Sequence, residues 1–288
     1  MISGVIPVDK PEGFTSFDVV AKCRGILKER RIGHSGTLDP MATGVLPLFI
    51  GKAARAVDIL PDTDKSYRAE FKLGFSTDTQ DITGSVLLRS EKRAERSEIE
   101  AALAGFTGEI SQIPPMYSAV KINGRRLYDL AREGRTVERE PRKITVYRFI
   151  LKDFDEESQS GVLEIDCSKG TYIRTLINDL GERLGTLGTM TALRRTRSQG
   201  FSVSQCVTLS QLESGAEKYI IPVERCFEAY PRLDLDSKRE RLYLNGVTLE
   251  ATLPDGLARV FGKEFIGIAK VSGGTVRPYK NFREAENE

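Results

Sequence analysis

Histidine, tryptophan and closely spaced cysteines are scarce or missing in this chain of 288 residues, which has one histidine and no tryptophan. Its four cysteines, Cys23, Cys167, Cys206 and Cys226, form no Cys-x-x-Cys pair. Because a structural zinc site usually needs four Cys or His ligands in close pairs, we expect no metal site. We expect the cysteines to be reduced and partly buried. If the chain is an enzyme, its acid–base chemistry must rest mainly on carboxylates, tyrosines and lysines.

Long apolar runs and nucleotide-binding motifs are also missing. The longest apolar run, residues 45–50, contains a proline and is far shorter than the roughly 18 to 20 residues of a membrane span. The first residues lack the basic and apolar regions of a secretory signal, so we expect a cytoplasmic protein without a membrane partner. Neither G-x-G-x-x-G nor G-x-x-x-x-G-K-[ST] occurs, so neither a dinucleotide nor a P-loop nucleotide is expected.

Charge is nearly balanced over the whole chain, with 43 Lys and Arg against 41 Asp and Glu, but it is distributed unevenly. Residues 21–31 hold five basic and one acidic residue, residues 111–148 hold nine and four, and residues 169–200 hold six and two. Residues 61–110 hold seven basic and ten acidic residues. If the fold brings the basic segments together, they form a face that attracts a polyanion. Three separate solvated surfaces are the alternative, and composition does not decide between them.

Residue patterns in the first 200 positions predict helices mixed with largely antiparallel strands. Alternating apolar and polar residues indicate half-buried strands, and apolar residues three and four apart indicate helices. Pro47, inside an apolar run, demands an edge strand or a bulge. In the first helix the expected buried stripe is Phe17, Val20, Cys23 and Leu27. The predicted elements are a helix from Thr15 or Ser16 to about Arg31, a strand at 44–51, a strand at 67–73, a short helix capped by Ser97 and Glu100 that stops at Gly105, a strand at 162–167 and a helix at 173–184.

The sequence changes character near Tyr230-Pro231. From there to Glu288, short apolar segments alternate with turn residues, which predicts a compact all-β appendage. The chain therefore divides into an expected larger domain, 1–229, and a smaller one, 230–288. The turns are expected at Asn245-Gly246, Pro254-Asp255-Gly256 and Gly273-Gly274.

The densest candidate for chemistry is RIGHSGTLDPMATGVL, residues 31–46. Its three glycines permit tight turns, and Pro40 restricts Asp39 to an extended conformation. Because a buried strand is expected directly after the loop, a carboxylate at Asp39 would stand on a rigid support, which suits catalysis. A plain Asp-Pro turn is the structural alternative.

A hydrolase triad of His34, Ser35 and Asp39 is a further alternative, and the sequence disfavours it. Adjacent His and Ser residues are badly placed for a hydroxyl–imidazole pair, and no G-x-S-x-G motif occurs. Asp39 in a pocket would instead need a cation to keep it ionised. By context the best candidate is Arg174, in CSKGTYIRTL, where a glycine turn leads from a strand into a helix.

Six strings, in order along the chain, resemble the TruB family of tRNA pseudouridine-55 synthases. They cover about residues 10–200, and the final segment, down to VRPYKNF, is similar to the small PUA-like domain that closes these proteins. The strings are DKPEGFTS (9–16), GHSGTLDPMATGVL (33–46), KSY (65–67), PPMYSAVKINGRRLYDLAREG (114–134), SKGTYIR (168–174) and ALRRT (192–196).

The resemblance implies a pseudouridine-synthase α/β (α+β) fold around a mixed, largely antiparallel sheet, with a small C-terminal PUA-like RNA-binding domain. It implies that a uridine in the T loop of tRNA is isomerised, without a metal or organic cofactor, by an enzyme that acts as a monomer and needs no protein partner. The family's essential aspartate corresponds to Asp39, either a covalent nucleophile or a base on the sugar. Arg174 would pair with it, and Tyr67 would stack on the extracted base and relay a proton.

Further residues would hold the RNA, because an enzyme that acts on a base must first take it out of its stack. Tyr172 and Leu193 would line the pocket, and His34 would hold the displaced loop or act as an ordinary hydrogen-bonding residue of its own loop. The basic segment 111–148 matches the family's flexible segment that closes over the RNA. The remaining expected RNA contacts are Lys10, Lys65, Arg125, Arg126 and Arg132.

Two other functions compete with this hypothesis. A guide-RNA-dependent relative would act inside a ribonucleoprotein, and the absence of extended basic termini argues against it. An RNA-binding or tRNA-folding chaperone on the same scaffold would not need Asp39 and Arg174, and the presence of both argues for catalysis.

Overall fold

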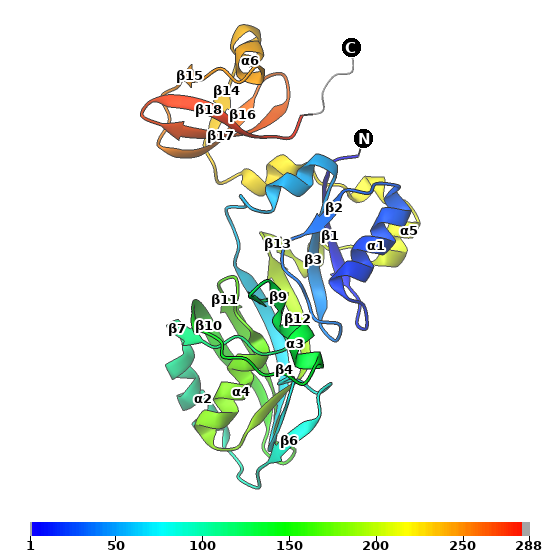
Figure 1. The fold of residues 1–288 in the computed structure, drawn as a ribbon, viewed down its shortest axis with the longest axis vertical. Helices are drawn as coiled ribbons and strands as arrows, with labels where there is room; N and C mark the ends of the chain where they lie inside the picture. Colours follow the sequence, from blue (N-terminus) through cyan, green and yellow to red (C-terminus); the bar gives the residue numbers. More distant parts are fainter. Residues whose placement is uncertain (1, 284–288) are drawn as a thin grey trace. The chain divides into compact units, whose positions relative to one another are not determined.

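A computed structural model describes residues 2–283 of the chain. These residues form two compact units (Figure 1). Unit 1 contains residues 2–40, 44–63 and 199–283, and unit 2 contains residues 41–43 and 64–198. None of the described helices combines the length and the apolar character that crossing a membrane requires.

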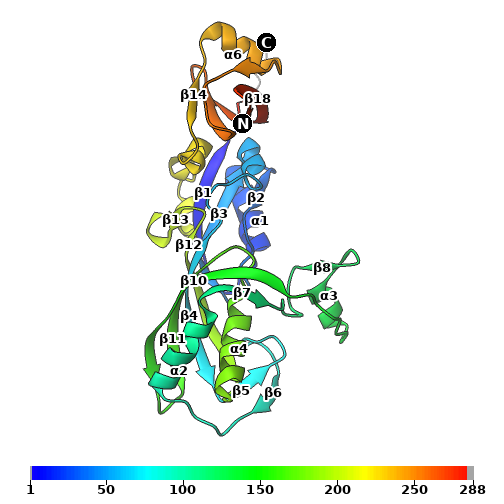
Figure 2. The ribbon, with the colours of Figure 1, turned by 90° about the vertical axis from the view of Figure 1, so that its left-hand side faces the viewer.

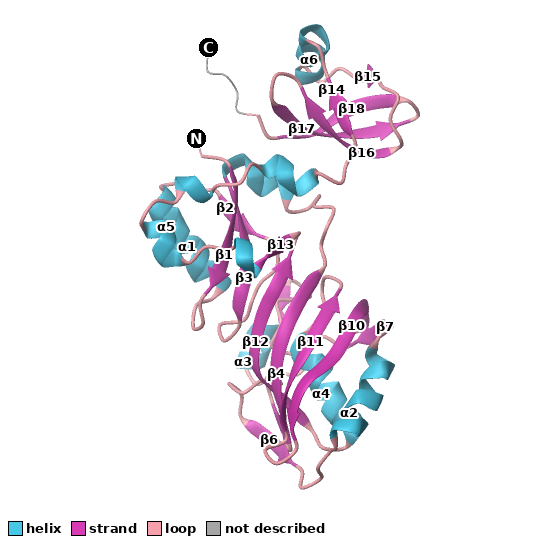
Figure 3. Ribbon diagram, turned by 180° about the vertical axis from the view of Figure 1, so that it is seen from behind, coloured by secondary structure: helices cyan, strands magenta, loops and turns pink. Residues whose placement is uncertain are grey.

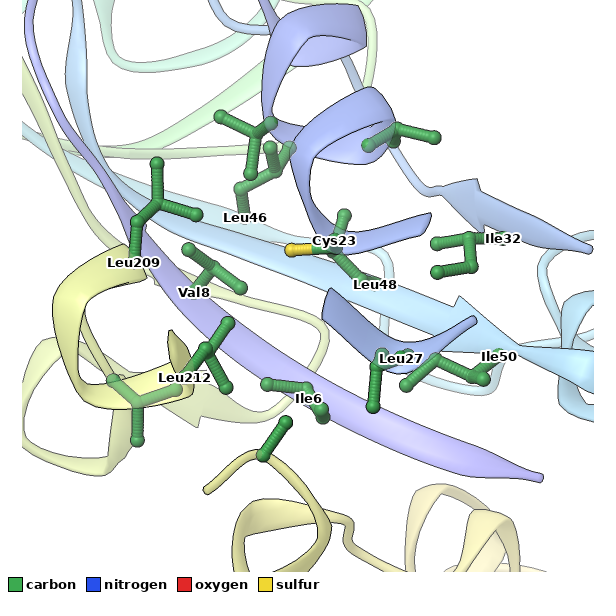
Figure 4. Packing of buried hydrophobic residues seen from close by; sticks show 14 residues of the cluster. Ile6, Val8, Cys23, Leu27, Ile32, Leu46, Leu48, Ile50, Leu209 and Leu212 are labelled. Atoms are coloured by element: carbon green, nitrogen blue, oxygen red, sulfur yellow. The ribbon is translucent and has the colours of Figure 1, made fainter. Parts of the chain in front are cut away.

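The first part of unit 1 is a small antiparallel sheet covered by helices. Strand β3 (Thr43–Ile50) pairs with β1 (Gly4–Lys10) and with β2 (Ile32–His34). Helices α1 (Ser16–Leu27) and α5 (Leu209–Glu213) pack against it. Figure 4 shows the core between these elements, where apolar side chains from both helices meet those of the strands. Members of this core include Ile6, Val8, Cys23, Leu27, Ile32, Leu46, Leu48, Ile50, Leu209 and Leu212.

Helix α1 confirms its predicted start and corrects its predicted end. The Thr15 hydroxyl accepts a hydrogen bond from Asp18 N at 3.0 Å, in a capping box. The helix stops at Leu27 instead of continuing to about Arg31, because Lys28 adopts a left-handed backbone with φ 51°. Phe17 is 64% exposed, so its assignment to the buried stripe is wrong, and Val19 is buried instead.

Pro47 does not create the expected edge or bulge. The β1–β3 pairing runs from Gly4 opposite Ile50 to Lys10 opposite Gly44 without a register shift, and Pro47 lies opposite Pro7. The Pro7 carbonyl accepts a hydrogen bond from Val207 N at 3.0 Å, so it points away from β3. The two prolines therefore meet at a position where neither strand needs an amide hydrogen.

Unit 2 is built on an antiparallel sheet with strand order β12-β4-β11-β10-β7. Helices α2 and α4 lie on one face of this sheet, and Figure 3 views the sheet from the other face. The predicted alternation in β4 and β11 and the predicted helix at 173–184 are confirmed. The elements are β4 (Lys65–Leu73), α2 (Arg96–Leu103), β7 (Gly108–Gln112), β10 (Arg142–Asp155), β11 (Ser160–Cys167), α4 (Ile173–Leu184) and β12 (Gly188–Ser198).

Helix α2 starts two residues earlier than predicted, because its capping box joins Glu95 to Glu98 rather than Ser97 to Glu100. Two hairpins extend from unit 2, and in Figure 2 the second one projects to the side of the sheet together with α3. They are β5 (Phe75–Thr77) with β6 (Val86–Arg89), and β8 (Lys121–Ile122) with β9 (Arg125–Arg126), which leads into α3 (Leu127–Arg132).

The final part of unit 1 is a five-stranded sheet with order β14-β16-β17-β18-β15 and its own apolar core. It is strand-rich but not all-β, because it holds an eight-residue helix, α6, that Asn245-Gly246 ends instead of making a hairpin. Gly273-Gly274 joins β17 to β18 as predicted. The elements are β14 (Arg232–Asp234), α6 (Ser237–Leu244), β15 (Leu249–Glu250), β16 (Gly256–Phe261), β17 (Phe265–Ser272) and β18 (Thr275–Asn281).

A second apolar cluster joins this sheet to the first part of unit 1. Phe282 and Ile268 pack with Phe227 and with residues of β3 and of the 3-10 helix that follows it. The remaining described elements are short 3-10 helices and one short strand. They are η1 (Gly51–Ala56), η2 (Ala104–Phe106), β13 (Phe201–Ser202), η3 (Val203–Gln205), η4 (Glu217–Tyr219) and η5 (Val223–Phe227).

Candidate active site

Asp39 lies in the loop between β2 and β3, and unit 1 fixes the backbone before it. The hydroxyl of Ser16, the first residue of α1, accepts a hydrogen bond from Leu38 N at 2.9 Å. The same hydroxyl donates to the Leu38 carbonyl at 3.2 Å. Ser16 and Leu38 are both buried, so these bonds lie out of water, where they hold the loop more firmly.

The backbone after Asp39 is fixed by Lys10, at the end of β1. Its ammonium donates to the carbonyls of Pro11 at 2.9 Å, Phe14 at 2.5 Å and Pro40 at 3.1 Å. Lys10 is 0% exposed, whereas a phosphate contact needs a side chain at the surface. This position differs from the expected RNA contact, and it makes Lys10 a support for the Asp39 loop.

His34 and Ser35 precede this loop. His34 ends β2 and is partly buried. The hydroxyl of Ser35 donates to the side-chain oxygen of Gln199 at 2.6 Å, so this bond uses the proton that a hydrolase triad would pass to an imidazole. The geometry gives the hydrolase alternative no support.

Arg174 is buried in the first turn of α4, in unit 2. Its Nη1 donates to the Thr79 carbonyl at 3.0 Å and to Asp81 Oδ2 at 3.4 Å, and its Nη2 donates to the Tyr117 carbonyl at 2.9 Å. The guanidinium is therefore held in one plane by groups from two other segments of the chain.

Asp81 is a site residue that the sequence analysis missed. It is buried, and its Oδ1 accepts hydrogen bonds from Thr79 Oγ1 at 2.9 Å, Thr83 N at 3.0 Å and Thr83 Oγ1 at 2.5 Å. These bonds orient the carboxylate so that Oδ2 faces Arg174. The run TDTQD could have indicated a local turn of Asp and Thr residues, but its partner lies 93 residues further along the chain.

Tyr67 and Leu193 share the sheet face that α4 covers. Tyr67 lies opposite Arg195 in the β4–β12 pairing, and Leu193 lies opposite Ala69. Both Tyr67 and Leu193 are buried, at 7% and 8% exposure. The first residue of β12 lies against the end of α4, and β12 then runs back along the helix, so Tyr67 is at the end of the sheet where α4 begins.

The remaining predicted residues of unit 2 fall into two groups. Tyr172 is the N-cap residue of α4, and Lys65 begins β4. Burial, followed by the charge of Arg195, lowers the pKa of Lys65. On the β8–β9 hairpin and α3 the predicted arginines are exposed: Arg126 donates to the Tyr128 hydroxyl at 2.8 Å, and Arg132 stacks on the Tyr128 ring. Arg125 forms an ion pair with Glu133.

Within residues 2–283, no group of three or more His, Cys, Asp or Glu side chains is arranged to hold a metal ion. The arrangement therefore offers carboxylate, guanidinium and phenol groups for chemistry. Unit 1 holds a loop that carries a carboxylate, and unit 2 holds a buried arginine and, on the sheet face that α4 covers, a buried tyrosine and a buried leucine.

Comparison with known proteins identifies the family. A model of the TruB family pseudouridylate synthase N-terminal domain matches residues 24–173, and one of the tRNA pseudouridylate synthase B C-terminal domain matches residues 174–228. The tRNA pseudouridine synthase B of Clostridium kluyveri is 42% identical over 93% of this chain and 95% of the relative. That of Pseudomonas fluorescens is 43% identical over 98% of this chain and 96% of the relative.

A solved structure extends the similarity to the fold. A chain in the Cbf5–Nop10–Gar1 complex matches with a TM-score of 0.74 and 28% identity, over 97% of this chain and 85% of that chain. The predicted fold class, a pseudouridine-synthase fold with a mixed sheet, is thereby confirmed, apart from the helix in the C-terminal part. The chain belongs to the TruB family of pseudouridylate synthases, and it is an isomerase.

Proposed function

We propose that the chain is a stand-alone tRNA pseudouridine synthase that isomerises the uridine at position 55, in the T loop. The observation that carries the proposal is the similarity, over almost the whole length, to proteins named tRNA pseudouridine synthase B. The hydrogen bonds of Ser16 and Lys10 to the backbone next to Asp39 also support it, because a catalytic group must be held accurately by its surroundings.

In this reaction the N–C glycosidic bond of uridine breaks and the same ring rejoins the ribose through carbon, so no atom is gained or lost overall. Asp39 is the proposed essential carboxylate, which acts on the sugar as a nucleophile or as a base. Both routes require the ionised carboxylate, and a nearby guanidinium favours that form. Arg174 is the proposed cation, and its own orientation is set by Asp81.

Tyr67, Tyr172 and Leu193 are proposed to receive the extracted base, with Tyr67 stacking on it, and His34 is proposed to hold the displaced loop. Thr43 follows Asp39 by four residues and accepts a hydrogen bond from Arg194, the neighbour of Leu193, at 3.2 Å. Thr43 is thereby held on strand β12 within unit 2.

RNA outside the pocket is proposed to bind through basic surfaces. The exposed arginines of the β8–β9 hairpin and α3 suit phosphate contacts. We also propose residues 230–288 as a PUA-like RNA-binding domain, with 1–229 as the catalytic domain. Its separate core is consistent with a module of its own.

The deciding experiment is turnover of a T stem-loop transcript by the purified chain, without guide RNA or protein partner. The wild-type protein is expected to form pseudouridine, measured by tritium release. A guide-dependent function is the competing proposal, because the similar Cbf5 structure is part of a multi-protein complex. Turnover that requires a guide RNA would overturn the stand-alone proposal.

Asp39→Asn tests the carboxylate. Its T-loop RNA affinity is expected to stay within about threefold, while pseudouridine formation is lost, because the amide keeps the shape but not the charge. Asp155→Asn, at the exposed end of β10, is the matched control and should keep full turnover. Substantial turnover by Asp39→Asn would exclude Asp39 as the essential group and assign the reaction to another residue.

A further inference from the structure

The side chain of one glutamine forms hydrogen bonds with both the amide and the carbonyl of Tyr172, which is proposed to line the pocket. Gln112 is the last residue of β7 and is 2% exposed. Its Oε1 accepts a hydrogen bond from Tyr172 N at 2.8 Å, and its Nε2 donates to the Tyr172 carbonyl at 3.0 Å. A side-chain amide thus pairs with the backbone as a neighbouring β-strand would, at the N-cap of α4.

The same segment reaches the site a second time, five residues later. The Tyr117 carbonyl accepts the hydrogen bond from Arg174 Nη2 at 2.9 Å. Between the two contacts lie Pro114 and Pro115, whose rings restrict the backbone. The Pro114 carbonyl also accepts a hydrogen bond from Arg139 at 3.1 Å. Residues 112–117 therefore form a stiff strap across the start of α4, tied at both ends.

We propose that Gln112 is a positioning residue for the reaction, which sets Tyr172 and, through the first turn of α4, Arg174. The proposal rests on the proposed function of the site. Tyr172 directly precedes α4, and Arg174 lies two residues after Tyr172. A shift of the Tyr172 backbone therefore moves both side chains. A misplacement of about 1 Å is enough to slow an enzyme by about 100-fold.

Only glutamine suits this position among residues of similar shape. Asparagine is one methylene shorter, and an ionised glutamate accepts from the Tyr172 amide but has no hydrogen for its carbonyl. An apolar side chain would remove both hydrogen bonds from this partly buried peptide, which is costly for its amide above all, because the carbonyl also accepts a hydrogen bond from Leu176 N at 3.1 Å. Gln112 therefore matches the Tyr172 backbone both as a hydrogen-bond donor and as an acceptor.

The chain offers a matched control in Gln159, which makes the same pair of bonds elsewhere in unit 2. Its Oε1 accepts from Ala94 N at 2.8 Å, and its Nε2 donates to the Ala94 carbonyl at 3.0 Å. Gln159 is 7% exposed, and its Nε2 also donates to the Glu156 carbonyl at 2.9 Å, so alanine there removes three hydrogen bonds. Gln159→Ala should lose at least as much stability as Gln112→Ala.

The first experiment compares these two variants in single-turnover assays on the T stem-loop, with RNA affinity and melting temperature measured alongside. Gln112→Ala is expected to slow the chemical step by about 10- to 100-fold while Kd stays within about threefold. Gln159→Ala is expected to keep its rate within about twofold despite its lower melting temperature. A rate loss that follows stability equally in both variants, or none in Gln112→Ala, would overturn the proposal.

A second variant gives a signature that general destabilisation does not produce. In Gln112→Glu, the protonated carboxyl group can donate to the Tyr172 carbonyl and accept from its amide, as glutamine does. Burial raises the pKa of such a group, so the protonated form gains as pH falls. The rate of Gln112→Glu relative to wild type should rise about tenfold from pH 8.5 to pH 6, while that of Gln112→Ala relative to wild type stays level. A flat ratio in the folded variant would contradict the role.

Hydrogen exchange separates this proposal from the proposed function. In the free protein, Gln112→Ala should speed exchange of the Tyr172 amide, and Gln159→Ala should speed exchange of the Ala94 amide instead. If wild type makes no pseudouridine in tRNA, the proposed function fails, but the exchange result still decides whether Gln112 holds Tyr172. Unchanged Tyr172 exchange would overturn the positioning role whatever the substrate.

Discussion

In two regions of the molecule, hydrogen bonds hold the surroundings of a charged side chain at different places. Around Asp39 in unit 1, Ser16 and Lys10 hold the neighbouring backbone through hydrogen bonds at Leu38 and Pro40. Around Arg174 in unit 2, the protein binds the charged group itself, through Asp81 and two carbonyls. The first arrangement fixes the backbone from which the Asp39 side chain extends. The second fixes the orientation of the Arg174 guanidinium.

This difference has a chemical reason. A group that acts on a substrate atom must be held accurately, and a fixed backbone on both sides of it contributes to that accuracy. A cation that orients or stabilises another group gains from a rigid, preorganised position. The comparison therefore predicts that disturbing the support of Arg174 and disturbing that of Asp39 will have different consequences.

The largest effect is expected from Asp81→Ala. It removes the Asp81 carboxylate from the buried Arg174, which costs stability as well as orientation, and turnover should fall by about 100-fold. Asp81→Asn, which keeps the shape, should fall less. The measurement is single-turnover pseudouridine formation, with Asp78→Ala in the same loop as control. Turnover of Asp81→Ala within about threefold of wild type would mean that Arg174 needs no carboxylate support.

Lys10→Met tests the other support. Removing a buried ammonium that donates to three backbone carbonyls should lower the free energy of unfolding by about 2 to 3 kcal/mol and slow turnover by about tenfold, with little change in RNA affinity. Urea unfolding and single-turnover assays measure both. If affinity and its salt dependence fall while the rate at saturating RNA persists, Lys10 binds phosphate, as the sequence analysis expected.

The contiguous features of this molecule were predictable from sequence. The Thr15 cap, the alternation in β4 and the bounds of α4 depend on neighbours within a few residues, and all three are confirmed. Asp81 and Gln112 were not predictable, because their partners lie 93 and 60 residues away. Lys10 resembles a surface cation in sequence, and only the folded chain reveals the carbonyls that surround it.

A smaller effect is expected on the exposed arginines, which contrast with the buried Arg174. Substituting Arg125, Arg126 and Arg132 one at a time with Gln should weaken T-loop RNA binding a few-fold, and each lost phosphate contact should reduce the slope of log K against log salt by about 0.7 to 0.9. The rate at saturating RNA should persist. Arg225→Gln, exposed on η5 of unit 1, is the control. A slope unchanged in all three variants would place the RNA elsewhere.

The smallest effect concerns a second charged residue of α4, Asp179. Burial raises the pKa of this carboxyl group to about 6, above its ordinary 3.8. The protonated form is thus favoured in the folded chain, so its stabilising contribution is complete below about pH 4 and is lost as pH rises through about 6. Asp179→Asn should remove this loss and raise the free energy of unfolding at pH 8 by about 1 kcal/mol, allowing for partial exposure, with no gain at pH 4.

Urea unfolding at the two pH values measures this, and turnover should be unchanged. Asp155→Asn is the control of opposite sign, because hydrogen bonds from Ser158 and Glu157 lower the pKa of Asp155, so its contribution is present at pH 8 and lost on acidification. If Asp179→Asn instead lowers stability at pH 8, the carboxylate is stabilised by its surroundings. Helix α4 would then stabilise the charged form of Asp179 as well as that of Arg174.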